Sequence, residues 1–237
     1  MDSAVMALST VTGVRPDIPW SAAPWFGDDR FLDTVSADAL AEAAMRTMDY
    51  GRDLDPELLG PWFHAIEAVA ARNPLPEPMA KMAIMLRACG RTDVSLELCD
   101  QTDAVQRIMF TEVVQAGTWR ALGDPVRTAA AFERALALEP DNWSLYLDLA
   151  DLHAEQGDFA AAAESVERGL RHAPEEPTLR AAGAAYRARR TGSAADLREL
   201  IDLAPQVPNA SYRRALIDYA CAGPGLPDDL VEAARRL

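Results

Sequence analysis

Apolar and polar residues along most of this chain follow the period of an α-helix. From about Ser36 onward, apolar side chains recur three and four positions apart, and no two-residue alternation typical of strands occurs. Helices are therefore predicted near residues 36–50, 56–72, 77–89, 92–101, 103–122, 125–138, 142–156, 158–171, 177–190, 193–203, 209–222 and 227–236. The connections are short, so successive helices run antiparallel. This pattern predicts an all-α fold.

Local signals mark where these helices begin and end. Residues that can cap a helix N-terminus precede four of them: Asp55, Asp124, Asp158 and Ser193. The first two are followed by proline, whose missing N–H costs little in the first helical turn. Glycines that favour a left-handed backbone stand just past four helical runs, at Gly90, Gly123, Gly157 and Gly192. These turns divide the chain into helix pairs.

The turn residues repeat with a fixed separation. Pro140 and Pro174 lie 34 residues apart, and the same separation joins Gly123 with Gly157, Asp124 with Asp158, and Ala116 with Ala150. A unit of helix, glycine turn, helix and proline turn cannot bury its apolar face alone. Such units are therefore predicted to stack into a solenoid.

Residues 109–142 and 143–176 resemble two tetratricopeptide repeats. The positions that match the family pattern are Trp119, Gly123, Phe132, Ala135, Pro140, Tyr146, Leu149, Ala150, Gly157, Phe159, Ala162, Gly169 and Pro174. The departures are Pro125, Thr128, His153 and Val166. Outside residues 109–176 the family pattern is matched at fewer positions, so any repeats there are degenerate. The resemblance implies a superhelical solenoid of antiparallel helix pairs that acts as a non-catalytic adaptor or scaffold for protein–protein interaction.

The same patterns predict the domain organisation. Residues 1–35 contain the stretch VRPDIPWSAAPWF and are expected to be irregular, because proline interrupts helices. Trp20, Trp25 and Phe26 in this stretch pack on the first helices or occupy a groove. Residues 36–237 are predicted to form a single helical repeat domain. Within it, residues 76–208 form the repeat core and residues 209–237 form capping helices.

Composition narrows the class of partner and the compartment. The chain has 23 basic and 37 acidic residues, a net charge of −14, which argues against binding to nucleic acid or to an anionic membrane. No segment has the roughly 18 apolar residues needed to span a bilayer. The three cysteines lack the spacing of a disulfide framework or a zinc site. We therefore expect a cytoplasmic protein; the single lysine, Lys81, among many arginines suggests a bacterial source.

The resemblance also implies a binding groove lined by the first helix of each pair. In the helix predicted at 142–156, a narrow polar stripe is formed by Ser144, Asp148, Asp151 and Glu155. The preceding unit offers an apolar patch of Phe110, Val113, Val114 and Gly117, and the following unit offers the basic residues Arg180 and Arg189. The predicted partner is a protein or peptide with an apolar anchor and basic residues. The alternative is that the stripe is a solvated acidic face.

Candidate catalytic chemistry is sparse. The three histidines, His64, His153 and His172, form no metal-binding motif, and no glycine-rich phosphate loop or nucleophile elbow occurs. No catalytic residue, metal or cofactor is therefore predicted. A regulatory subunit or sensor that binds a signal peptide or small ligand is the alternative function, and an enzyme is less favoured. The sequence predicts no oligomeric state.

Overall fold

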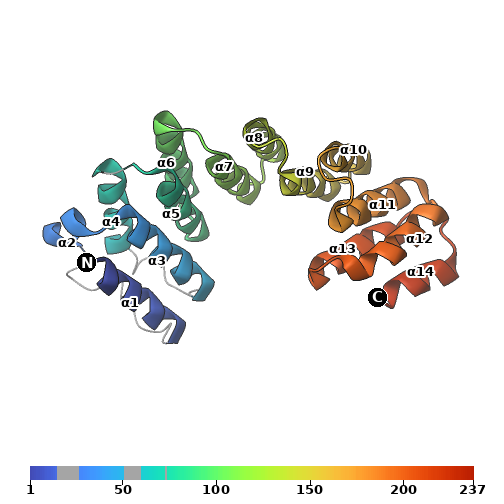
Figure 1. The fold of residues 1–237 in the computed structure, drawn as a ribbon, viewed down its shortest axis with the longest axis horizontal. Coiled ribbons are helices and arrows are strands. Elements are labelled where there is room, and N and C mark those ends of the chain that lie inside the picture. The colour runs from blue at the N-terminus through green and yellow to red at the C-terminus, as the bar shows by residue number, and fades with distance from the viewer. Residues whose placement is uncertain (15–26, 51–59, 73) are drawn as a thin grey trace. The chain divides into compact units, whose positions relative to one another are not determined.

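The computed structural model describes residues 1–14, 27–50, 60–72 and 74–237, which form helices joined by turns without a strand among them (Figure 1). The predicted all-α solenoid class is confirmed. The chain divides into two compact units, Met1–Ala131 and Phe132–Leu237. Each unit has its own core of buried apolar side chains.

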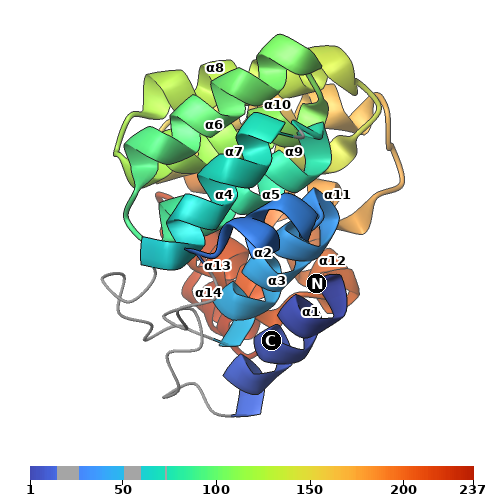
Figure 2. The same ribbon diagram turned by 90° about the vertical axis from the view of Figure 1, so that its left-hand side faces the viewer.

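The first unit is a stack of short helices. They are α1 (Asp2–Val14), α2 (Asp29–Thr34), α3 (Ala37–Tyr50), α4 (Gly60–Arg72), α5 (Pro76–Ala88), α6 (Thr92–Val105), α7 (Met109–Ala121) and the beginning of α8 (Pro125–Leu138). Helix α3 packs against α1 and α5, and α5 packs in turn against α6 and α7 (Figure 2). The stack from α1 through α3 and α5 to α7 thus follows the order of the chain.

Large side chains fill the core of the first unit. Trp62 and Ile66 of α4 are almost fully buried, as are Met82 and Met85 of α5. The Trp62 indole N–H donates a hydrogen bond to the Met85 sulfur, which satisfies the one polar atom of that ring. Arg72, at the end of α4, donates to the backbone carbonyls of Leu32 and Val35 and so ties α4 to α2.

The second unit is built from successive helix pairs. Its complete helices are α9 (Trp143–Glu155), α10 (Phe159–Leu170), α11 (Pro177–Thr191), α12 (Ala194–Leu203), α13 (Ala210–Cys221) and α14 (Asp228–Arg235), with a short 3-10 helix at Ala204–Gln206. Helix α10 packs on α9 and α11, and α11 packs on α12 and α13. Small residues at the contacts allow this close packing: Ala150, Ala162 and Ala182 are completely buried.

The predicted turns and caps are present where the structure describes them. Gly90, Gly123, Gly157 and Gly192 all have positive φ, between 68° and 77°. The carboxylates of Asp124 and Asp158 and the hydroxyl of Ser193 accept hydrogen bonds from backbone N–H groups three residues later. Asp55 lies outside the described residues. The helix predicted at 125–138 coincides with α8, and most others agree within two residues.

Two predicted features differ from the structure. Residues 1–35 were expected to be irregular, but α1 and α2 lie there, and Val5 of α1 is completely buried. The proline-rich stretch with Trp20, Trp25 and Phe26 lies outside the described residues. The interruption predicted near residue 102 falls instead between α6 and α7, because Gln106 takes an extended conformation (φ −159°, ψ 118°). The domain limits at residues 36, 76 and 209 stay predictions.

Candidate protein-binding surface

Asp151 of α9 bonds to two tyrosines from later helices. Its Oδ1 atom accepts hydrogen bonds from the hydroxyl of Tyr186 on α11, at 2.5 Å, and from that of Tyr212 on α13, at 2.9 Å. Tyr186 is completely buried and Tyr212 is half-buried. Hydrogen bonds to an ionised acceptor are among the stronger ones in proteins. The carboxylate therefore joins three helices that are far apart in the sequence.

Burial of these hydroxyls also affects their titration. Removal from solvent raises the pKa of Tyr186 and of Tyr212 well above the ordinary value of tyrosine, and the negative charge of Asp151 raises both further. Both phenols therefore stay protonated and able to donate at neutral pH. Asp151 was predicted to belong to the polar stripe, but it is engaged inside the fold.

The other residues of the predicted stripe differ in exposure. Ser144 and Glu155, at the two ends of α9, are exposed, and Asp148 between them is half-buried. The Ser144 hydroxyl donates to the side chain of Asn142 at 2.7 Å, within the turn that precedes the helix. Hence these three residues leave acidic and polar groups at least partly accessible along α9.

The next helix of the same kind lacks such a face. The positions of α11 that lie 34 residues after the stripe are Thr178, Ala182, Ala185 and Arg189. The first three are buried, and the two alanines have no exposed surface at all. Because α13 packs directly against α11, this face is covered by protein. The open polar surface of the second unit is therefore carried by α9 and not continued by α11.

The predicted basic residues of α11 have separate surroundings. Arg180, near the start of the helix, lies 3.7 Å from Glu175. It lines a cavity with residues of α12, among them Glu199. Arg189, near the end, donates to the carbonyl of Ala222 and lies 5.1 Å from the centre of the Phe159 ring. The two arginines therefore contact different elements and do not form one basic edge.

The predicted apolar patch belongs to the first unit and is partly closed. Val114 of α7 is 2% exposed and is part of the core, so its side chain is not available to a partner. Gly117 is covered by Arg87 of α5, whose guanidinium donates to the Val114 carbonyl at 3.3 Å. Phe110 and Val113 are half-buried. These four residues and the stripe lie in different units.

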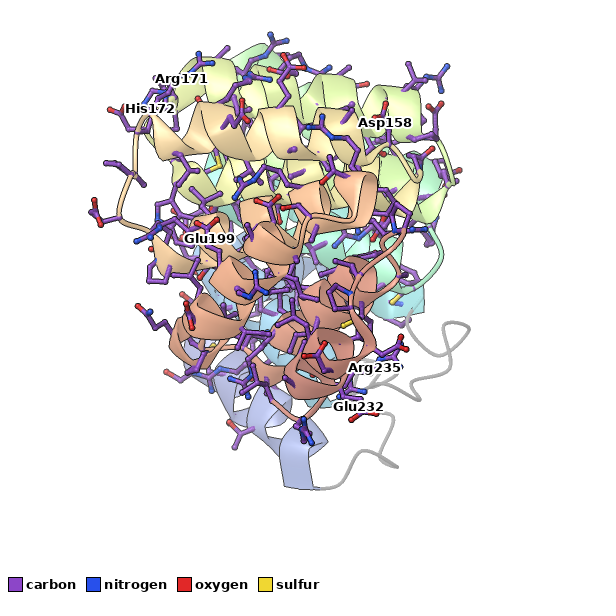
Figure 3. All side chains as sticks on the ribbon, turned by 90° about the vertical axis from the view of Figure 1, so that its right-hand side faces the viewer. Asp158, Arg171, His172, Glu199, Glu232 and Arg235 are labelled. Atoms are coloured by element: carbon purple, nitrogen blue, oxygen red, sulfur yellow. The ribbon has the colours of Figure 1, made fainter. Side chains whose placement is uncertain are left out.

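The histidines offer no convergent chemistry. His64 is exposed and His153 is half-buried. His172 lies at the opposite end of α10 from Asp158 (Figure 3), bonds to Asp141 at 2.8 Å and stacks on Tyr146. Among the described residues, no group of three potential metal ligands occurs, and no helix is both long and apolar enough to cross a membrane.

The repeat pattern is confirmed by comparison with a known family. Residues 120–186 match the family model described as tetratricopeptide repeat. This part of the chain, which runs from the end of α7 into α11, therefore consists of tetratricopeptide repeats, as the resemblance over residues 109–176 predicted. No curated protein matches the sequence.

Three solved structures resemble the chain in fold. A thermophilic tetratricopeptide repeat protein of Thermus thermophilus, TTC0263, shares 20% identity over 78% of this chain and 98% of its own, with a TM-score of 0.49. The MamA protein shares 12% identity over 77% of this chain and 91% of its own, with a TM-score of 0.48. A chain in the structure of Naa15/Naa10 bound to HypK-THB shares 18% identity over 84% of this chain and 33% of its own, with a TM-score of 0.48. None of these likenesses bears on function.

The sequence pattern missed the partners of Asp151. Tyr186 and Tyr212 lie 35 and 61 residues further along the chain, so no local spacing points to them. One signal was present: a helix of alanines, α11, with a single buried tyrosine. A buried tyrosine carries a hydroxyl at its tip that needs a hydrogen-bond partner. On such a helix this indicates a partner on a neighbouring helix.

Proposed function

We propose that this chain is a non-catalytic module that binds a segment of another protein on the polar face of α9. The observation that carries the proposal is the exposure of Ser144, Glu155 and, in part, Asp148 on the first helix of a pair that lies wholly within the family match. Asp151 takes no part in partner binding here, because its carboxylate serves the fold.

The charge of this region selects the chemistry of the partner. Residues 143–176 contain eight acidic and two basic residues, a net charge of −6. A complementary segment carries Lys or Arg opposite Asp148 and Glu155, together with apolar side chains that supply most of the affinity. We place this adaptor in the cytoplasm of a bacterium.

A photo-crosslinking experiment tests where the partner binds. Benzoylphenylalanine replaces Ser144 in the full chain, which is expressed in the native cell, and crosslinked species are identified by mass spectrometry. The matched control places the same group at Glu167, an exposed residue of α10. We expect one protein to be captured from position 144 and not from 167. Capture from both positions, or from neither, would contradict the proposal.

Charge reversal then tests the carboxylates. Asp148→Lys with Glu155→Lys should slow association with the captured partner at low salt and lose this effect at high salt, because exposed ion pairs are screened. Each pair contributes about 0.2–1 kcal/mol to binding. The control with equal charge change is Glu167→Lys with Glu232→Lys. Equal association rates for the two double variants would show that the acidic face is merely solvated.

A regulatory subunit or sensor is the second candidate. The observation that favours it is a cavity of about 550 Å³ between α11 and α12, lined by Arg180, Arg198, Asp202 and Gln206 among others. Its volume lies in the range of small-molecule sites, about 300–1,000 Å³. Calorimetric titration with a mixed set of acidic peptides and small carboxylic acids tests this candidate. Binding that Arg198→Ala removes would support it, and the absence of binding would reject it.

A further inference from the structure

The first unit has an apolar groove that the proposed α9 surface does not use. It has a volume of about 360 Å³ and lies between α4 and α6, with α5 beneath. The apolar side chains that line it are Ile66, Ala70, Ala71, Leu86, Val94 and Leu98. Four of these, Ile66, Ala70, Leu86 and Leu98, are only 1–5% exposed and belong to the buried core of the unit. The half-exposed Val94 and the exposed Ala71 supply the accessible apolar surface. The groove is thus an opening onto that core.

Carboxylates border this groove, and none of the described residues that line it is basic. Glu67 of α4 and Glu97 of α6 lie on its rim, and both are exposed. On α6, Asp93 and Asp100 stand four residues before and three after Glu97, which puts them on the same helical face. Acidic side chains therefore outnumber basic ones at this rim, where Arg91 lies over the Phe63 ring of α4. A ligand with an apolar side chain and basic groups can gain from both kinds of contact.

We infer that this groove binds a basic amphipathic segment of a protein partner. Such a helix would place one or two apolar side chains against Val94 and Ala71 and direct Lys or Arg toward Glu67 and Glu97. Amphipathic helices commonly bind in apolar grooves through side chains at spacings of three, four and seven residues. Charge complementarity selects this occupant over an acidic peptide or an anionic surface.

The apolar contact is expected to dominate the affinity. Burial of one Leu or Phe side chain contributes on the order of tenfold to a hundredfold in binding. Each exposed ion pair at the rim contributes about two- to fivefold and is weakened by salt. The surface is separate from α9, so this inference does not depend on the proposed function.

A designed peptide provides the test. The probe is a labelled helical peptide with Leu at positions spaced by three, four and seven residues and Lys on both flanks. Two control peptides carry Asn in place of Leu, or Glu in place of Lys. Binding to the full chain is measured by fluorescence anisotropy, and methyl NMR signals of Ile66, Val94 and Leu98 report where the peptide lies. We expect the first peptide to bind and to shift these three signals, and both controls to bind at least tenfold more weakly.

Variants of the rim sharpen this test. Glu67→Lys with Glu97→Lys should weaken binding of the Lys peptide by about four- to twentyfold and restore binding of the Glu peptide. The matched control is again Glu167→Lys with Glu232→Lys, which should leave both affinities unchanged. Circular dichroism confirms that each variant is folded.

Two outcomes would overturn the inference. One is no binding of the Lys peptide to the folded wild-type chain. The other is binding that shifts methyl signals of Leu147 and Leu149 on α9 while Ile66, Val94 and Leu98 stay unchanged. The second outcome would leave the proposed α9 surface standing, whereas failure of the crosslinking at Ser144 would leave the groove standing.

Discussion

Helices α9 and α11 hold equivalent places in successive repeats, yet their faces differ completely. Residues 144, 148 and 151 of α9 are Ser and two Asp, whereas the residues 34 positions later on α11 are Thr and two Ala. The first face is partly open, and the second is buried beneath α13. Glycine, proline and small contact residues set the repeat, and the remaining face can be open or packed. Of the two equivalent faces here, that of α9 is partly open and that of α11 is used for packing.

The largest expected effect concerns Asp151, the stripe residue that accepts hydrogen bonds from α11 and α13. Asp151→Ala removes the acceptor of both Tyr186 and Tyr212 and should lower the free energy of unfolding by about 3–6 kcal/mol, since each of the two hydrogen bonds to a charged group contributes about 1.5–3 kcal/mol. Glu155→Ala, at an exposed position of the same helix, should change it by about 0.5 kcal/mol or less. Urea unfolding of both variants measures the difference. Equal losses would show that Asp151 behaves as a surface residue.

A smaller effect separates the turns that follow the two helices. Gly157 and Gly192 both have positive φ, and a left-handed conformation costs a residue with a Cβ about 1–2 kcal/mol. A Cβ at Gly157 would meet nothing within 4 Å, whereas one at Gly192 would lie 1.7 Å from the Pro224 carbonyl oxygen. Gly192→Ala should therefore lower the melting temperature clearly more than Gly157→Ala. Matching melting temperatures would mean that the second turn is as open as the first.

The smallest expected effect is a loss of stability that appears only at alkaline pH. Tyr186 and Tyr212 have pKa values raised by burial in the folded state, while in the unfolded chain they titrate near 10.0. Above that pH the unfolded state loses protons first, so the tyrosines destabilise the fold increasingly as the pH rises. The contribution of these two tyrosines to the free energy of unfolding should therefore be constant below about pH 9 and fall above pH 10. In Tyr186→Phe the alkaline decline, followed by urea unfolding at several pH values, should be shallower; an unchanged slope would contradict the burial.

The fold was largely predictable because its signals are local. Proline at 140 and 174 and glycine at 123 and 157 act on their immediate neighbours, so helix limits such as 125–138 follow from the sequence directly. The prediction that residues 2–14 are irregular was wrong because it extended the effect of prolines from residue 16 onward to residues well before them. Asp2–Val14 contains no proline and forms a helix that packs on α3.

The candidate binding surface was less predictable because exposure depends on distant segments. Helical spacing put Ser144, Asp151 and Glu155 on one face, and of these Ser144 and Glu155 are exposed while Asp151 is half-buried. Their role in binding stays a prediction. Only the position of Tyr212, 61 residues later, decides that Asp151 is engaged. Val114 likewise has the right spacing for a groove residue, and the neighbouring helix α5 decides that it is buried.

The contact between Asp151 and Tyr212 has a consequence for how the second unit unfolds. In most solenoids each repeat touches only its neighbours, so stability is a sum of single repeats and adjacent interfaces. Here α9 is bonded to α13, past the alanine-rich α11, so a repeat interacts with the next but one. When α13 detaches, the hydrogen bond from Tyr212 to Asp151 of α9 is therefore lost as well. The unit from α9 to α13 should therefore unfold as one cooperative block, without stepwise fraying from its end.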